Sequence, residues 1–168
     1  MLPTTRTILI RSARPYDGAE LLDVQQTIYD EDEWFVGDAA PDMPFIKRRL
    51  ATVAARRSVY LLALCEQDIC AWLELNRHLP KKLGHVAVLT LAVAKPYRRE
   101  GLASRLLSQG YLEATKLGIR KISLSVRASN KAALSLYERE GFLLEGCEKA
   151  HIRTAQGFED NLIMAKFL

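Results

Sequence analysis

The chain has 168 residues, of which 49% are hydrophobic and 26% are charged, and its formal net charge is +4. These values are close to the averages of soluble globular proteins, so they exclude a disulfide-stapled mini-protein, a fibrous repeat and wholesale disorder. The positive charge leaves open an anionic partner such as a nucleic acid, a membrane surface or a phosphorylated small molecule. Because no linker, low-complexity tract or internal repeat interrupts the sequence, residues 1–168 are expected to form a single domain.

The cysteines and the apolar runs bear on the compartment. Cys65, Cys70 and Cys147 are odd in number, lie in apolar runs and form no CxxC pair, so we expect reduced core thiols and no metal site. Residues 1–6 lack the features of a secretory signal. The apolar runs are shorter than the roughly 20 residues that span a bilayer. We therefore expect a cytoplasmic protein without a membrane partner.

The first third of the chain predicts one strand and two helices. Residues 7–11 are typical of a short strand, and a helical pattern of apolar residues then runs from 17 to 28. An irregular stretch over 30–42 precedes a second amphipathic helix over about 45–55. The irregular stretch contains no lysine or arginine and six acidic residues, Asp30, Glu31, Asp32, Glu33, Asp38 and Asp42.

The middle of the chain predicts the centre of a sheet. Two strands are predicted over 59–64 and 69–75. Nearly every residue from 85 to 93 is apolar, which predicts a central strand buried on both faces. Pro96 ends this strand, and small or apolar residues at helical spacing predict a long helix over 101–117.

The last third alternates again between strand and helix. Residues 122–126 alternate apolar side chains with serines, so one face of this strand meets something hydrophilic. Asn130 is a good N-cap for a helix that ends at Gly141. Two closing strands over about 142–151 and 159–167 complete an α/β fold with a mixed sheet and helices on both faces.

The loop at 93–103 joins the central strand to the long helix, where unpaired N–H groups and the helix dipole favour an anion. Gly101 and Ala103 are small enough to let a ligand approach, and Arg98 and Arg99 add positive charge. The nucleotide-triphosphate loop and the three-glycine dinucleotide fingerprint are both absent, so ATP and NAD are poor candidates. Taken alone, the loop fits a diphosphate site and an ordinary strand–helix connection about equally.

Two motifs together resemble one family. Arg98, Gly101 and Ala103, followed by the Asn, Leu-Tyr and Gly-Phe pattern within 130–142, look like the GCN5-related N-acetyltransferases, the GNAT superfamily. Several segments between residues 126 and 165 resemble the bacterial acetyltransferases that modify the N-terminal alanine of a ribosomal protein. The resemblance implies the GNAT fold, a mixed, mostly antiparallel twisted sheet of six to seven strands flanked by about four helices.

The resemblance also implies acetyl-CoA as the acetyl donor. Its pyrophosphate would bind the amides of residues 98–103, extended by Ser104, and its pantetheine arm would run beside residues 91–93. Asn130 would hydrogen-bond the cofactor as well as capping its helix, or would serve as the cap alone. The implied cofactor-binding residues are Leu91, Ala92, Val93, Arg98, Arg99, Glu100, Gly101, Leu102, Ala103, Ser104, Asn130 and Tyr137.

Acetyl transfer to an amine needs a neutral amine, a hydrogen-bond donor for the tetrahedral oxyanion and a proton for the departing thiolate. By resemblance, Tyr137 is the general acid that supplies this proton, and the alternative is an aromatic residue on the core face of its helix. A backbone N–H within 91–93 is the expected oxyanion donor. The expected acceptor is a primary amine of a small molecule or a peptide N-terminus, which attacks directly in a ternary complex.

The general base is where this chain departs from the ribosomal-protein enzymes. Ser125 occupies the position of their glutamate, and a serine hydroxyl accepts a proton poorly. The base then comes from elsewhere or is water. Glu74 is the first candidate, because Trp72 and Asn76 lie on the same side of its strand and would place a carboxylate in the cleft; a solvated strand residue is the alternative. His85 and the acidic stretch 30–42 are further options.

Two other classes of function stay open. A CoA-binding regulatory module that has lost its chemistry fits the absence of a carboxylate at Ser125. A nucleic-acid-binding module is suggested by the positive charge alone, without a zinc pattern, an aromatic sheet motif or a dense basic helix, so we expect no nucleic-acid partner. Homodimers are frequent in the superfamily, and whether this chain forms a homodimer is left open.

The net charge is the sum of two unequal parts. The stretch 30–42 contributes −6, so the remaining 24 basic and 14 acidic residues contribute +10. We expect the basic part to serve the phosphates of CoA around Arg98 and Arg99. The acidic stretch is either a solvated loop or a surface that faces a cationic amine acceptor.

Overall fold

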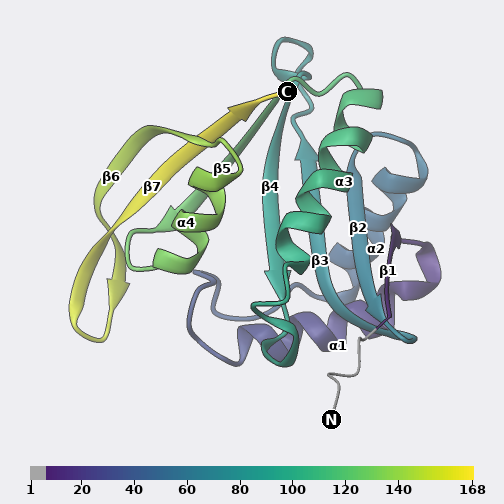
Figure 1. The fold of residues 1–168 in the computed structure, drawn as a ribbon, viewed down its shortest axis with the longest axis horizontal. Coiled ribbons are helices and arrows are strands. Elements are labelled where there is room, and N and C mark those ends of the chain that lie inside the picture. The colour runs from purple at the N-terminus through teal and green to yellow at the C-terminus, as the bar shows by residue number, and fades with distance from the viewer. Residues whose placement is uncertain (1–6) are drawn as a thin grey trace.

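Strands from both halves of the chain pair in one seven-stranded sheet in the computed structural model, which describes residues 7–168 (Figure 1). The strands are β1 Ile8–Ser12, β2 Val59–Cys65, β3 Asp68–Arg77, β4 Val86–Val93, β5 Lys121–Arg127, β6 Leu143–Thr154 and β7 Gly157–Phe167. Their order is β1-β2-β3-β4-β5-β7-β6, and only β4 and β5 are parallel. The predicted mixed, mostly antiparallel sheet is confirmed. Residues 1–6, on which the expectation about a secretory signal rests, lie outside the described range.

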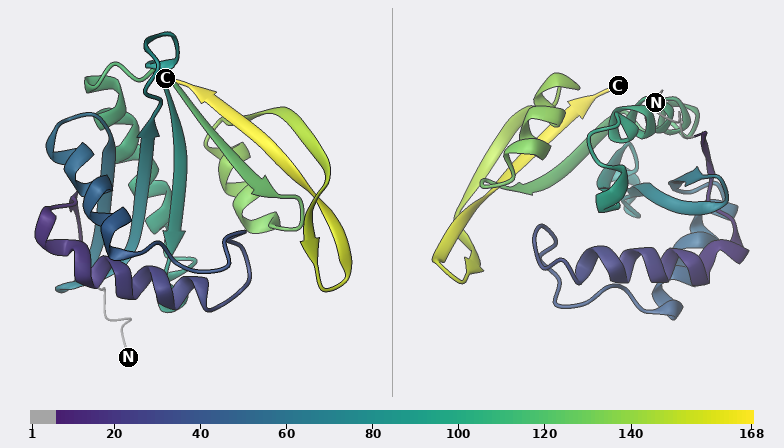
Figure 2. Two further views of the ribbon diagram at one scale, coloured as in Figure 1. Left: turned by 180° about the vertical axis from the view of Figure 1, so that it is seen from behind. Right: turned by 60° about the horizontal axis from the view of Figure 1, so that its bottom comes forward.

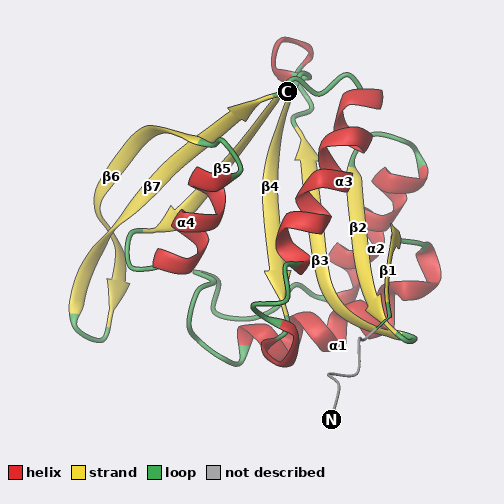
Figure 3. Ribbon diagram, viewed as in Figure 1, coloured by secondary structure: helices red, strands yellow, loops and turns green. Residues whose placement is uncertain are grey.

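Four α-helices cover the two faces of this sheet within residues 7–168 (Figures 2 and 3). They are α1 Gly18–Tyr29, α2 Met43–Ala54, α3 Leu102–Lys116 and α4 Lys131–Arg139. Helices α1 and α2 pack on one face, and α3 and α4 pack on the other. Single 3-10 turns at 15–17, 81–83 and 95–97 lie in the connections.

The core lies on both sides of strands β2 and β3. Leu61 and Leu73 belong to the apolar cluster beneath α3, whereas Leu62 and Trp72 belong to the cluster beneath α1 and α2. Successive side chains of a strand point to opposite faces, so a strand covered by helices on both sides is apolar throughout. Every residue of β2 is accordingly buried.

Strand β4 is central, as predicted, but it is not buried on both faces. It pairs with β5 only where Val86–Val88 lies beside residues 121–123, and the two strands then diverge (Figure 1). Val88 is 37% exposed, and residues 90–93 are only partly buried. The apolar run therefore marks a strand that pairs with β3 along one edge and lacks a strand partner beyond Val88 along the other.

Helix α2 begins two residues before the predicted position. The side chain of Asp42 accepts a hydrogen bond of 2.9 Å from the backbone N–H of Phe45, and Pro44 occupies the first turn. Both are standard features of a helix start. One acid of the stretch 30–42 therefore serves as an N-cap.

All three cysteines are free, as expected, but they are not all core thiols. Cys65 and Cys70 are buried in β2 and β3, whereas Cys147 is exposed. Cys147 lies on β6, which forms the edge of the sheet and is exposed over most of its length, so an apolar sequence neighbourhood does not bury it there. Across residues 7–168, no helix is long and apolar enough to cross a membrane, and no group of three or more His, Cys, Asp or Glu side chains is arranged to hold a metal ion.

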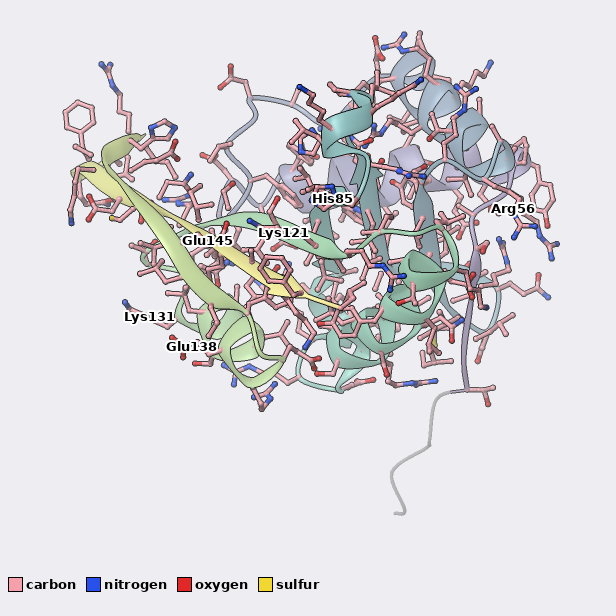
Figure 4. All side chains as sticks on the ribbon, turned by 90° about the horizontal axis from the view of Figure 1, so that it is seen from above. Arg56, His85, Lys121, Lys131, Glu138 and Glu145 are labelled. Atoms are coloured by element: carbon pink, nitrogen blue, oxygen red, sulfur yellow. The ribbon has the colours of Figure 1, made fainter. Side chains whose placement is uncertain are left out.

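An ion pair ties the edge strand to the rest of the sheet. Lys121 of β5 reaches across β7 and contacts both carboxylate oxygens of Glu145 on β6, at 2.7 and 2.8 Å (Figure 4). This contact lies at the end of the sheet where β5 is still paired with β4. It holds the β6–β7 hairpin against β5 and leaves open the space where β4 and β5 diverge.

We predict that Gly110→Val destabilises the protein, because a side chain at this position of α3 would meet Leu73 of β3. A Cβ at Gly110 would lie 3.1 Å from the nearest methyl carbon of Leu73, which is fully buried and has little room to move. Overpacking a core costs about 1–3 kcal/mol, so the free energy of unfolding in urea should fall by about 2 kcal/mol. The control is Ser108→Val on the exposed face of the same helix, which should change it by less than about 0.5 kcal/mol. Equal losses in the two variants would contradict close packing as the cause.

Candidate functional site

A cleft of about 550 Å³ opens where β4 and β5 diverge. Its walls come from six segments of the chain, with lining residues within 28–36, 88–93, 97–104, 125–127 and 130–139 and at Asn161. Because β4 and β5 lose their mutual hydrogen bonds here, the cleft extends between the α3–α4 face and the α1–α2 face of the sheet. The loop before α3 and the acidic stretch after α1 therefore line the same cleft.

The cleft brings together eleven of the twelve predicted cofactor-binding residues. They are Leu91, Ala92, Val93, Arg98, Arg99, Gly101, Leu102, Ala103, Ser104, Asn130 and Tyr137. Glu100 is exposed and does not line the cleft. Proximity does not test binding, so the cofactor roles of these residues stay predictions.

The start of α3 has the geometry of an anion site. Arg99 and Gly101 both adopt left-handed backbone conformations, with φ of 66° and 77°, and no side chain caps the helix. Residues 101–104 all line the cleft, and the first N–H groups of an α-helix have no partner within it. Nothing lies within 4 Å of where a Cβ would stand on Gly101. This turn therefore presents the positive end of a helix to the cleft, with room for a ligand to approach.

Helix α4 contributes the second predicted motif. The Asn130 side chain accepts a hydrogen bond of 3.1 Å from the backbone N–H of Ala133, so its predicted role as N-cap is confirmed. Tyr137, two turns further along, is 8% exposed and packs against Phe142 with ring centroids 5.4 Å apart. Burial raises the pKa of Tyr137 to about 12, so its phenol keeps its proton at neutral pH.

The structure does not bring Glu74 into the cleft. Glu74 shares a face of β3 with Trp72, as predicted, but α1 and α2 cover that face. Its carboxylate is buried and forms an ion pair with Arg49 of α2. Burial raises the pKa of Glu74, and the charge of Arg49 opposes that rise. The expectation of a carboxylate in the cleft at this position is therefore wrong, and the cross-strand partner Thr90 lines the cleft instead.

Of the other predicted base options, only the acidic stretch reaches the cleft. His85 (Figure 4) is exposed and lies just before the N-terminal end of β4. The cleft is lined by residues 88–93, toward the C-terminal end of that strand. Glu31 and Glu33 line the cleft, and Ser125 lines it from β5. The acidic stretch is therefore more than a solvated loop, although Glu31 already pairs with Arg98 at 2.6 Å.

Sequence reasoning missed the aromatic and basic residues that complete the walls. Trp34 and Phe35 line the cleft from within the acidic stretch, and Phe35 lies in a stack between Tyr29 and Trp72, with centroid distances of 4.6 and 6.2 Å. Arg127 lines it from the end of β5. Two adjacent aromatic residues directly after four acidic ones were the one available signal, because large aromatic side chains are mostly buried in folded proteins.

Comparison with known proteins identifies what this arrangement resembles. The model of the acetyltransferase (GNAT) family matches residues 21–142. The [ribosomal protein bS18]-alanine N-acetyltransferase of Escherichia coli (strain K12) is 39% identical over 83 residues, which are 49% of this chain and 56% of that protein. The chain thus spans about half the length of the curated relatives it matches.

Solved structures share the fold over nearly the whole chain. A GNAT-family acetyltransferase from Streptococcus pneumoniae has a TM-score of 0.90 and 28% identity, with 96% of this chain and 100% of that one covered. A putative acetyltransferase from Salmonella typhimurium, solved with its cofactor acetyl-CoA, has a TM-score of 0.87 at 15% identity, with 96% and 94% covered. The second likeness concerns the fold alone.

We predict that Arg49→Met destabilises the protein in a pH-dependent way, because it leaves the Glu74 carboxylate buried without its partner. Removing one member of a buried ion pair costs about 3 kcal/mol. The raised pKa means that the lone carboxyl is protonated as the pH falls, so the loss of unfolding free energy should be smaller near about pH 4 than near about pH 8. The control is Arg48→Met, at an exposed neighbouring position, which should change the free energy of unfolding by less than about 0.5 kcal/mol. A loss of the same size at both pH values would rule out this account of Glu74.

Proposed function

Because the chain belongs to the acetyltransferase (GNAT) family, we propose that it transfers an acetyl group from acetyl-CoA to a primary amine of a small molecule or a peptide N-terminus. The observation that carries the proposal is the cleft between the diverging strands β4 and β5, which brings the uncapped start of α3 and Tyr137 of α4 to one opening. We propose one catalytic domain over residues 1–168. A cytoplasmic location is proposed with it, since the three thiols are free.

Acetyl-CoA is proposed to bind along two of the cleft walls. The pyrophosphate would lie on the N–H groups of residues 101–104, where the helix dipole and the charge of Arg99 favour it. The pantetheine arm would run beside residues 91–93, because β5 no longer pairs with β4 there. The Val93 carbonyl already accepts a hydrogen bond from Arg98, so the arm would bind the other backbone groups of this edge. Asn130 faces the same opening and would contact the cofactor from the start of α4.

The proposed chemistry is direct attack in a ternary complex. The amine nitrogen forms a bond to the acetyl carbon, the oxyanion accepts a hydrogen bond from a backbone N–H within 91–93, and the carbon–sulfur bond then breaks. Tyr137 donates its proton to the departing sulfur, and the attacking nitrogen loses one. With Glu74 buried outside the cleft, Glu33 is the carboxylate left for that proton, directly or through water, since its side chain is 50% exposed and lines the cleft.

A CoA-binding regulatory module is the second candidate. It rests on Ser125, which lines the cleft where related enzymes carry a glutamate. Release of free thiol from acetyl-CoA across a panel of amines separates the two candidates, because a regulatory module binds CoA without turnover. The absence of nucleic-acid and membrane partners stays a prediction, and homodimer formation stays open.

We predict that Gly101→Ala weakens CoA binding through the anion site at the start of α3. Alanine in the left-handed conformation costs about 1 kcal/mol of stability, and relief of this strain would move the amides away from the pyrophosphate. Gly118→Ala is a matched control, because Gly118 has the same conformation, with φ of 76° and an equally open Cβ position, at the other end of α3. Both variants should lose similar stability, and calorimetric titration should show weaker CoA binding for Gly101→Ala alone. Equal CoA affinities in the two variants would refute the proposed pyrophosphate site.

We predict that Tyr137→Phe lowers the turnover number by about 100-fold or more at neutral pH and leaves the CoA dissociation constant nearly unchanged, because it removes a proton donor and keeps the ring. Tyr111→Phe is the control, since Tyr111 contacts Glu140 and does not line the cleft. The raised pKa of Tyr137, about 12, keeps the phenol protonated, so no alkaline loss of activity below about pH 10 should depend on it. An unchanged turnover number in Tyr137→Phe would remove this residue from the acid role.

A further inference from the structure

The side chain of Arg98 does not extend toward the start of α3, although its backbone belongs to the loop that leads there. Its Nε donates to the carbonyl of Val93 at 2.8 Å, and its Nη2 donates to Oε2 of Glu31 at 2.6 Å. The remaining nitrogen, Nη1, lies 3.9 Å from Oε2 of Glu33. All three guanidinium nitrogens are thus engaged by the end of β4 and by the acidic stretch.

A second arginine holds the same stretch from the opposite side of the opening. Arg127, at the end of β5, donates through Nη1 to the carbonyl of Glu33 at 2.6 Å, and its guanidinium lies 5.9 Å from the ring centroid of Trp34. The same guanidinium forms an ion pair with Glu159 of β7. Residues 31–34, which we name the strap, are therefore held from the β4 side by Arg98 and from the β5 side by Arg127.

The strap spans the place where the two strands have diverged, and it forms a wall of the cleft. Glu31, Glu33 and Trp34 all line the cleft. The stretch from 30 to 42 contains no helix or strand. Backbone hydrogen bonds hold its first residues, 30–32, to the end of α1, and the contacts of the two arginines add to them across the cleft. The Arg98–Glu31 pair is suited to this task, since its side chains are 30% and 18% exposed and charge-assisted hydrogen bonds are stronger where water is partly excluded.

We propose that Arg98 is a positioning residue: its guanidinium fixes the strap, which forms the wall of the cleft that would receive the amine. Its side chain does not bind the cofactor phosphates. The proposal rests on the proposed acetyltransferase function. Arg99, which is exposed at the cleft, is then the arginine whose side chain serves the phosphates. One short loop thereby serves two ligands, with backbone amides and Arg99 directed at the cofactor and Arg98 directed at the wall that receives the amine.

The first experiment measures the effects on the amine and on CoA separately. Arg98→Met should lower kcat/KM for the amine by about tenfold or more and change the CoA dissociation constant, measured by calorimetry without an amine, by less than about twofold. Arg99→Met should weaken CoA binding by about tenfold. Arg105→Met is the matched control, since Arg105 is an exposed arginine of α3 that contacts the carbonyl of Ile8, away from the cleft, and both constants should stay as in the wild type.

The second experiment reads the strap without any turnover. The chain has two tryptophans, and Trp72 is 2% exposed, so acrylamide quenching of fluorescence reports mainly on Trp34. Arg98→Met and Glu31→Gln should each increase quenching. Quenching in the double variant should not exceed that of the stronger single variant, because both substitutions remove the same contact between Arg98 and Glu31. Arg98→Lys, which keeps the charge, should recover part of the amine kcat/KM.

The results distinguish the positioning role from its rival and from failure of the proposed function. Suppose that Arg98→Met weakens CoA binding as much as Arg99→Met does, and leaves both kcat/KM for the amine and the quenching of Trp34 unchanged. Arg98 is then a phosphate ligand, and the proposal is overturned. If quenching increases as expected while the wild-type protein releases no thiol with any amine, the strap contact stands and the acetyltransferase function fails.

Discussion

Strands β4 and β5 are hydrogen-bonded over only three residues of β4, and the site depends on this interrupted pairing. Parallel strands held along their full length would place Leu91 and Val93 in the interior of a continuous sheet. Their separation instead exposes an edge of β4 in the middle of the sheet and leaves an opening between the two helical layers. A chain segment that is central in the fold can therefore be a ligand-binding edge, which sheets otherwise offer only at their margins.

The opening is kept from collapsing by elements on each side of it. Helix α3 packs closely on β3 at Gly110 and buries Leu102 in its first turn, which fixes its N-terminus beside the end of β4. On the other side, α4 is fixed by the Asn130 cap and by the contact of Tyr137 with Phe142. The strap closes the third side through Arg98. Rigid elements thus carry the groups proposed for the cofactor, whereas an irregular segment carries the wall proposed for the acceptor.

The acidic and basic residues of this protein are unevenly distributed along the chain. The acidic stretch contributes −6 and the remaining chain +10, so the modest net charge of +4 conceals two opposed regions. The structure brings these regions together at the cleft, where Glu31 forms an ion pair with Arg98 and where Arg99 also lies in the wall. Much of the acidic charge is therefore used internally, as the Asp42 cap also illustrates, and the sequence total says little about which partner the surface attracts.

Local chemistry in the sequence determined the elements and the half of the cleft that we propose for the cofactor. The helix start at Gly101, the Asn130 cap and the alternation along β5 are short-range signals, because each depends on residues within one or two turns, and the structure has all three. The tertiary structure alone decided which face each strand turns to which helix, and this placed Glu74 against Arg49 instead of in the cleft. It also decided where β4 and β5 diverge and how the strap crosses between them. These features depend on contacts between residues far apart in the chain, such as Arg98 with Glu31 and Arg127 with Glu33, for which the periodicity of a single segment carries no information.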